Sequence, residues 1–180
     1  MSTADLNVPG FYGKMPATGD FVTRRLPGDF VRVWDRWLAQ HIVPLFGLDA
    51  WPQGTSLRLL AGPGSFGASA GVLLLSTDRI GRQFPLTVVA RLAEAPLKLA
   101  YCDDWFDGIE SAAFAAQRGE LTPDGLDAAL TALPVPQVER DGQTIDDLVM
   151  WTARTDIFDV ASDAPQPTLE QILAAVRETD

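Results

Sequence analysis

The fold is decided by the stretch Gly71-Val72-Leu73-Leu74-Leu75-Ser76-Thr77-Asp78-Arg79-Ile80-Gly81-Arg82-Gln83-Phe84-Pro85-Leu86-Thr87-Val88-Val89-Ala90. Two apolar β-type runs flank a turn in which Asp78, Arg79 and Arg82 surround Gly81. Charges between two hydrophobic strands are costly unless they pair with one another or meet a partner. The stretch therefore predicts a hairpin whose turn is held by an ion pair or used for binding.

Short glycine-bearing connections join this hairpin to a third apolar run, which indicates an antiparallel meander. We expect its strands over residues 55–61, 69–76 and 84–92, with a shorter strand over 11–15. The middle run is apolar at nearly every position, which is typical of a strand buried on both faces. Helices must then cover both sides of the sheet. The predicted fold is α/β, with a largely antiparallel central sheet in a three-layer αβα sandwich.

A helix is predicted from Gly28-Asp29, which should cap it, to about residue 43, where Pro44 should stop it. Its apolar face comprises Phe30, Trp34, Trp37, Leu38, His41 and Leu45. Arg32 and Arg36 lie on the opposite face, and Asp35 lies at the edge of the apolar face, within reach of Arg32. This pattern is typical of a helix that packs on a sheet.

The second half of the sequence is mainly helical in pattern. An apolar stripe after Pro96 runs to Gly119, and its helix carries a separate acidic sector of Asp103, Asp104, Asp107 and Glu110. Another helix should open at Thr122-Pro123, and a last one at a capping box, Thr168-Leu169-Glu170-Gln171. Residues 147–152 indicate a further strand. We expect a single domain over 1–180, with a motif-bearing part at 10–90 and an acidic helical part at 97–180.

Charge is distributed unevenly along the chain. The net charge is −10, yet residues 1–98 hold ten basic and seven acidic residues, whereas residues 99–180 hold four basic and seventeen acidic ones. Such a balance argues against nucleic acid as a partner, because phosphates require a basic surface. A polarised surface can orient a protein partner. Alternatively, the acidic half is a solvated face that keeps the protein soluble.

Compartment is indicated by what the sequence lacks. No apolar stretch approaches ~18 residues, so we expect no membrane insertion. The first residues have neither the basic nor the apolar region of a signal peptide. A single cysteine, Cys102, cannot form an internal disulfide, which suits a reducing compartment. The predicted location is cytoplasmic.

Residue patterns for the usual chemistries are missing. Residues 62–67 match G-x-G-x-x-G, but a strand follows them where a dinucleotide site needs a helix, so they predict a hairpin loop. His41 is the only histidine and lies on an apolar face, which favours a core position over a metal site. Ser76 and Asp78 have no histidine in a triad pattern, and Cys102 has no recognisable activating group. We expect no enzymatic activity and no cofactor.

Three blocks of sequence carry a family resemblance. They are Gly10 to Pro27, then Trp34-Asp35-Arg36-Trp37-Leu38, then Leu75 to Leu86. In this order they resemble the TagF family, also called ImpM, of accessory proteins of the bacterial type VI secretion system. The resemblance covers roughly residues 10–90. Leu75 replaces a proline of the family pattern and Ile80 a valine, and both keep the apolar character.

The resemblance implies a cytoplasmic protein that restrains type VI secretion after translation by binding the forkhead-associated scaffold protein of that system. We expect the partner to contact Arg24, Arg25 and Arg79. A structural role is expected for Asp20, Asp35, Asp78 and Arg82, with Asp20 or Asp78 pairing with Arg82 or Arg25, and the Asp78–Arg82 pair buried. The alternative is a small-anion sensor or an enzyme that uses the Asp78–Arg82 turn. The oligomeric state is not indicated.

Overall fold

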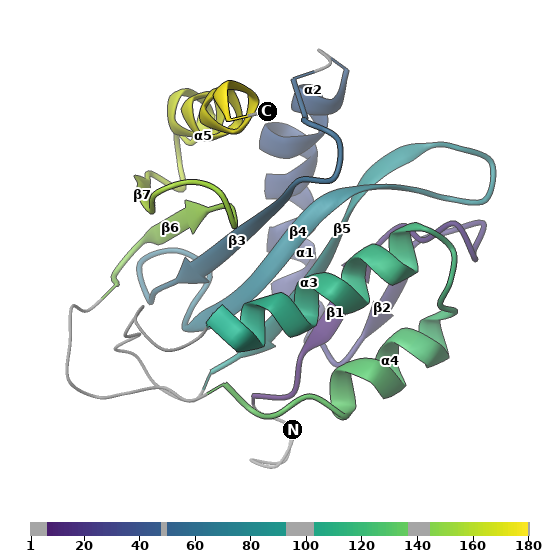
Figure 1. Cartoon of the computed structure of the whole chain (residues 1–180). Helices are drawn as coiled ribbons and strands as arrows, with labels where there is room; N and C mark the ends of the chain where they lie inside the picture. Colours follow the sequence, from purple (N-terminus) through teal and green to yellow (C-terminus); the bar gives the residue numbers. More distant parts are fainter. Residues whose placement is uncertain (1–6, 48–49, 93–102, 137–144, 180) are drawn as a thin grey trace.

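The computed structural model describes residues 7–47, 50–92, 103–136 and 145–179. Within them lies a seven-stranded sheet in the order β2-β1-β5-β4-β3-β6-β7, in which all neighbouring strands run antiparallel (Figure 1). The strands are β1 (Gly10–Gly13), β2 (Val22–Arg24), β3 (Ser56–Ala61), β4 (Ser69–Thr77), β5 (Gln83–Arg91), β6 (Leu148–Trp151) and β7 (Phe158–Val160). The predicted α/β fold with an antiparallel central sheet is confirmed.

The centre of the sheet is the meander that the sequence predicts. Strands β3, β4 and β5 are consecutive neighbours, and their register places Leu57, Leu73 and Thr87 side by side. The glycine-rich segment 62–67 connects β3 to β4, and its Gly62 N–H donates to the Asp147 carbonyl at 2.7 Å. This segment is therefore a hairpin connection, as predicted.

Successive residues of β4 enter two separate hydrophobic clusters. Val72 and Leu74 belong to a cluster with residues of α3 (Asp103–Gln117) and α4 (Pro123–Thr131). Leu73 belongs to a second cluster with residues of α1 (Gly28–Trp37), the π-helical segment η1 (Leu38–Ile42), α2 (Val43–Phe46) and α5 (Gln166–Glu178). In Figure 1, α3 crosses in front of the sheet and α1 behind it. Both faces of β4 are thus buried.

The N-terminal helical segment buries the predicted face but differs at both ends. Trp34 is 1% exposed, and its indole N–H donates to Thr87 Oγ1 at 3.2 Å. The N-cap is Pro27, with no side-chain cap from Asp29. Pro44 does not stop the helix, because η1 leads into α2 and places Pro44 in the first turn of α2. A proline is tolerated there, since N–H groups of a first turn have no intrahelical partner.

The remaining differences lie at short or terminal elements. The edge strands β2 and β7 were not predicted, because three residues each are too few to show an alternating pattern. The last helix begins at Gln166 with Pro165 as its N-cap, so Thr168 lies inside its first turn and the predicted capping box is wrong. The predicted start of α4 is confirmed, as Thr122 Oγ1 accepts the Gly125 N–H at 3.1 Å.

Candidate functional site

The turn between β4 and β5 is organised around one buried carboxylate. Asp78 is 2% exposed. Its Oδ2 lies 2.6 Å from Arg82 Nε and 3.1 Å from Lys14 Nζ. Its Oδ1 accepts the backbone N–H groups of Ile80 at 3.1 Å and of Arg82 at 3.0 Å. The predicted Asp78–Arg82 pair is confirmed, although only Asp78 is buried: the Arg82 side chain is 57% exposed.

These contacts set the charge state of Asp78. Burial alone would raise the pKa of its carboxyl, but the hydrogen bonds from Arg82, Lys14 and Ile80 outweigh burial and hold the pKa well below its usual range. Lys14 is itself buried, so the two form a buried ion pair between the β4–β5 turn and the segment after β1. No local pattern indicates that Lys14 is this partner, because 63 residues lie between Lys14 and Asp78 in the chain.

The segment after β1 holds the turn in place from the side. The Arg79 N–H donates to the Thr18 carbonyl at 2.8 Å, and Arg79 Nη2 donates to the Ala17 carbonyl at 3.1 Å. Arg82 Nη2 reaches the Gly19 carbonyl at 2.9 Å. Gly81 has a φ of 86°, a conformation that favours glycine in a tight turn. Residues 14–20, from the first block of family resemblance, and the β4–β5 turn therefore form one corner of the molecule.

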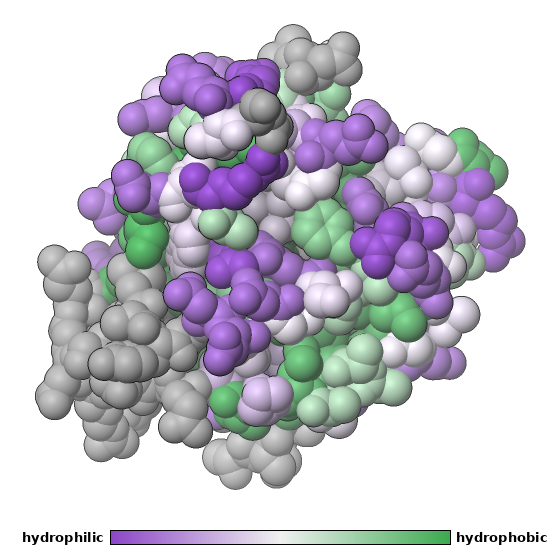
Figure 2. All heavy atoms as spheres, in the orientation of Figure 1, coloured by the Kyte–Doolittle hydropathy of each residue, from purple (hydrophilic) through white to green (hydrophobic). Residues whose placement is uncertain are grey.

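An apolar side chain projects from this corner. Ile80 is 74% exposed, more than any other large hydrophobic residue that the structure describes. Phe21 is 44% exposed, its ring packs edge-on against Phe84 at 4.8 Å between centroids, and Lys14 Nζ lies 5.2 Å from its centroid. We call Arg79, Ile80 and Arg82, at the tip of the β4–β5 hairpin, the hairpin-tip patch. At the right edge of Figure 2, over the β4–β5 tip, hydrophobic atoms lie beside strongly hydrophilic ones.

Two predicted structural carboxylates have other partners than expected. Asp20 is exposed and accepts the Phe21 N–H at 2.8 Å, and the described residues provide no ion pair for it. Of the two carboxylates that were expected as alternatives, Asp78 and not Asp20 pairs with Arg82, because the β1–β2 segment turns Asp20 outward. Asp35 accepts the Tyr12 hydroxyl at 2.6 Å and so links α1 to β1. Burial and this hydrogen bond raise the pKa of Tyr12.

Two of the predicted contact residues connect β2 to α4. Arg24 Nη2 lies 3.3 Å from Asp124, and both side chains are largely exposed. Arg25 donates twice to the Asp127 carboxylate, at 2.9 and 3.1 Å, and its φ of 57° is unusual for a residue other than glycine. Both arginines thus have intramolecular partners, and their contact with another protein stays a prediction.

A second charged cluster, centred on Arg58 of β3, was not predicted. The Arg58 side chain is 4% exposed, and the acidic sector of α3 surrounds it. Its guanidinium lies 2.5 Å from Asp107, 2.6 Å from Glu110 and 3.7 Å from Asp103. Burial would lower the pKa of Arg58, but the hydrogen bonds to Glu110 and Asp107 outweigh it and raise the pKa. The acidic sector of α3 therefore has a structural role, because three of its carboxylates pair with Arg58 and bind the helix to the sheet.

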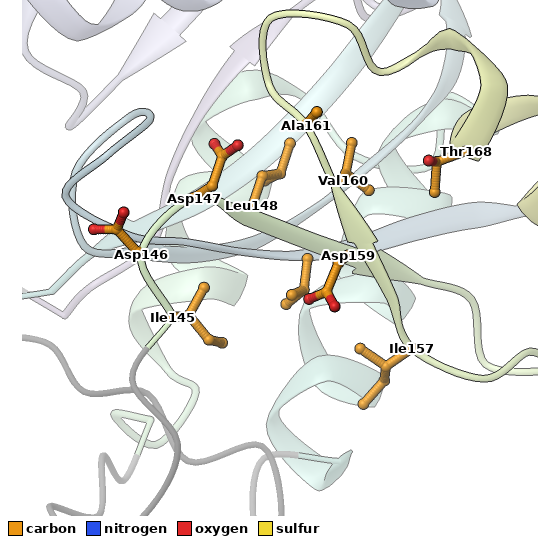
Figure 3. A pocket seen from close by; sticks show the side chains of 10 residues that line it. Ile145, Asp146, Asp147, Leu148, Ile157, Asp159, Val160, Ala161 and Thr168 are labelled. Atoms are coloured by element: carbon orange, nitrogen blue, oxygen red, sulfur yellow. The ribbon is translucent and has the colours of Figure 1, made fainter.

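The described cavities are not lined by the residues of the β4–β5 turn, and two of them border the Arg58 cluster. A cavity of about 850 Å³ beside β6 and β7 includes Asp146, Asp147 and Asp159 in its lining. In Figure 3 their carboxylates point in different directions, and the described part of the chain contains no cluster of metal-ligating residues.

His41 is buried against Trp37 and contacts Gln166, as expected of a core histidine, whereas Cys102 lies outside the described residues. In the described segments no helix is both long and apolar enough for a bilayer crossing.

Comparison with known proteins identifies the family. A family model described as TagF N-terminal domain, type VI secretion system-associated, matches residues 10–133. The match includes the whole hairpin-tip patch and extends beyond the residues that carried the resemblance in sequence. The crystal structure of PA0076 from Pseudomonas aeruginosa PAO1 is similar, with a TM-score of 0.65 and 31% identity over 96% of this chain and 78% of that one. No match was found among curated proteins. The chain therefore belongs to the TagF_N family of type VI secretion system-associated proteins.

Proposed function

We propose that this protein is a non-catalytic accessory of the type VI secretion system. It restrains secretion after translation by binding the forkhead-associated scaffold protein in the cytoplasm. Family membership supports the link to the secretion system. The scaffold as partner, and repression as the result, rest on the resemblance of the three sequence blocks to the TagF family.

The observation that supports a binding role is the arrangement of side chains at the corner formed by residues 14–20 and the β4–β5 turn. Its cations are not arranged around a cavity: Lys14 and Arg82 pair with Asp78, and Arg79 reaches a backbone carbonyl. The corner instead presents the exposed Ile80 on a hydrogen-bonded turn. A central apolar anchor surrounded by polar side chains is typical of hot spots in protein interfaces. This favours protein binding over the anion-sensor or enzyme alternative, in which Arg79 and Arg82 would have to converge on a ligand.

The proposed contacts are Arg79 at the corner, Arg24 at the end of β2 and Arg25 directly after it. Arg24 faces a carboxylate that is 91% exposed, so a partner can replace that ion pair at little cost. The fold of this chain that positions these contacts is proposed to be a three-layer αβα sandwich. The two hydrophobic clusters on either side of β4 support this proposal.

The test combines binding and secretion. We expect the purified protein to bind the forkhead-associated scaffold of the same gene cluster, and its overproduction to stop secretion. Arg24→Glu and Arg79→Glu should abolish both effects while the protein stays folded, because a reversed charge at a complementary interface is costly. Arg36→Glu, on the exposed face of α1, is the matched control.

Lack of binding by the wild type would refute the scaffold as partner. Turnover of phosphoester, peptide or nucleotide substrates that disappears in an Asp78 or Arg82 variant would refute the non-catalytic role.

A further inference from the structure

The hairpin-tip patch combines an exposed aliphatic side chain with a backbone held by hydrogen bonds. Ile80 is 74% exposed, although a folded protein gains nothing from leaving an isoleucine in water. Its backbone is nevertheless fixed, since the Ile80 N–H donates to Asp78 and the neighbouring Arg79 N–H donates to Thr18. The Gly81 N–H closes the turn on the Asp78 carbonyl at 3.0 Å. The turn therefore holds Ile80 outward without requiring it for the core.

Such an arrangement lowers the cost of association. Ordering a loop or side chain on binding consumes part of the interaction free energy, and a preorganised element avoids that cost. A single rigid apolar side chain at the centre of a polar rim matches the usual form of an interaction hot spot, which is a central anchor in a pocket surrounded by contacts that exclude water.

Charge decides which kind of surface can receive this anchor. Arg79 and Arg82 flank Ile80, and the Arg82 side chain is 57% exposed. Both guanidinium groups donate to backbone carbonyls of the β1–β2 segment, which fixes their position while leaving further N–H groups for a partner. The chain as a whole has a net charge of −10, but the half that contains these arginines holds more basic than acidic residues. A complementary surface needs carboxylates around an apolar depression.

We infer that the hairpin-tip patch docks by inserting Ile80 into an apolar socket on a partner protein, with carboxylates at the rim of the socket pairing with Arg79 and Arg82. The inference rests on the proposed binding function and specifies the surface and the chemistry of its partner. An anionic membrane surface could also attract arginines beside an apolar side chain. One fully projecting aliphatic residue buries little area in a bilayer, however, so a shaped protein socket fits better.

The decisive experiment places a photo-crosslinking benzophenone amino acid at position 80 or at position 157 of the full chain, in a bacterium that carries the secretion cluster. Ile157 is the matched control: it is an isoleucine with 45% exposure, next to β7 at the far edge of the sheet. Position 80 should crosslink to a protein encoded by the cluster, at a segment with both apolar residues and Asp or Glu. Position 157 should not crosslink to that segment.

Binding of the captured protein is then measured with purified variants whose circular dichroism matches that of the wild type. Ile80→Asp and Arg79→Glu should each weaken binding at least about 30-fold, the loss typical of a hot-spot residue. Ile80→Leu should stay within about tenfold of the wild type, because it conserves volume and apolar character. Ile157→Asp should bind like the wild type.

The outcomes separate this inference from the proposed function. Capture of a cluster protein other than the scaffold refutes the scaffold assignment and leaves the docking inference standing. Equal binding of the scaffold by the wild type and Ile80→Asp overturns the docking inference alone. It is also overturned if position 80 captures no cluster protein, if the captured segment lacks carboxylates, or if phosphatidylglycerol vesicles sediment the wild type but not Ile80→Asp.

Discussion

Two ion-paired centres of this protein have opposite arrangements of charge: one has a buried anion, and the other a buried cation. At one, the buried Asp78 carboxylate is surrounded by Lys14, Arg82 and backbone N–H groups. At the other, the buried Arg58 guanidinium is surrounded by three carboxylates of α3. The first centre fixes a turn that presents side chains to solvent, and the second fixes a helix to the sheet. At both centres one buried ion pairs with several side chains, and these side chains differ in their exposed fractions.

This arrangement predicts that stability depends on the central ion more than on any exposed partner. Removal of a buried ion leaves every partner without its counter-charge, whereas removal of one exposed partner leaves the central ion still paired. The exposed fraction therefore ranks the partners: Glu110 is 12% exposed, Asp107 67% and Asp103 85%.

The largest effect is expected at Arg58. Arg58→Met should lower the free energy of unfolding by about 3–5 kcal/mol, because it leaves the poorly solvated Glu110 carboxylate without the guanidinium that pairs with it. Chemical denaturation with urea measures this change. Asp103→Asn, at the exposed end of the cluster, should cost about 1 kcal/mol or less. Equal losses in the two variants would show that burial does not rank the members of the cluster.

The next effect is expected at Asp78, and it separates the two members of a pair. Asp78→Ala should lower the melting temperature by about 5 °C or more, since Lys14 then remains buried without a counter-ion. Arg82→Ala should cost about 1 kcal/mol or less, because Asp78 keeps Lys14 and the Arg82 side chain is largely exposed. Thermal unfolding followed by circular dichroism checks both. A larger loss for Arg82→Ala than for Asp78→Ala would contradict the central role of the carboxylate.

The carboxylate at the first centre also predicts how its contribution to stability responds to acid. The pKa of Asp78 is lower in the folded protein than in the unfolded chain, so its ionised form stabilises the fold above the unfolded-state value of about 3.9. This stabilisation is lost as pH falls below that value toward the folded pKa. The difference in unfolding free energy between the wild type and Asp78→Asn should therefore be full at pH 7 and shrink below pH 4. A difference that stays constant down to pH 2 would argue against the shift.

The smallest effect is expected where both partners are exposed. Arg24→Ala should change the free energy of unfolding by about 0.5 kcal/mol or less, because its pair with Asp124 is solvated on both sides. Arg25→Ala should cost more, since Arg25 forms a bidentate contact with Asp127 and a further hydrogen bond to Thr131. Urea denaturation of the two variants side by side is sufficient, and an inverted order would remove bidentate geometry as the explanation.

The two centres also show what the sequence can predict. Asp78 and Arg82 are four residues apart in one turn, so their pairing follows from local geometry. The partners of Arg58 lie 49 and 52 residues further along, on a helix whose placement depends on the whole sheet. Sequence patterns found the acidic sector of α3 but could not show that a buried arginine lies beneath it. The exposed position of Ile80 likewise depends on the β1–β2 segment that supports the turn.

The same distinction applies to the helices and strands: those specified by local sequence were predicted, and those that depend on distant residues were not. The meander β3–β4–β5 was predicted because long apolar runs and short connections specify it locally. The passage of the helix beyond Pro44 depends on a π-helical turn that carries no recognisable sequence signature. The edge strands depend on their neighbours, since three residues gain β-structure only by pairing with a strand already in place.

The position of β6 in the sheet has a practical consequence for work with fragments. The family match ends at residue 133, whereas β6 begins at Leu148 and pairs with β3. A fragment that ends at residue 133 would leave β3 as an edge strand, although all six residues of β3 are buried in the full chain. Long apolar edges recruit strands from other molecules. Such a fragment should therefore self-associate, while the full chain ends its sheet in two three-residue strands that offer little template for aggregation.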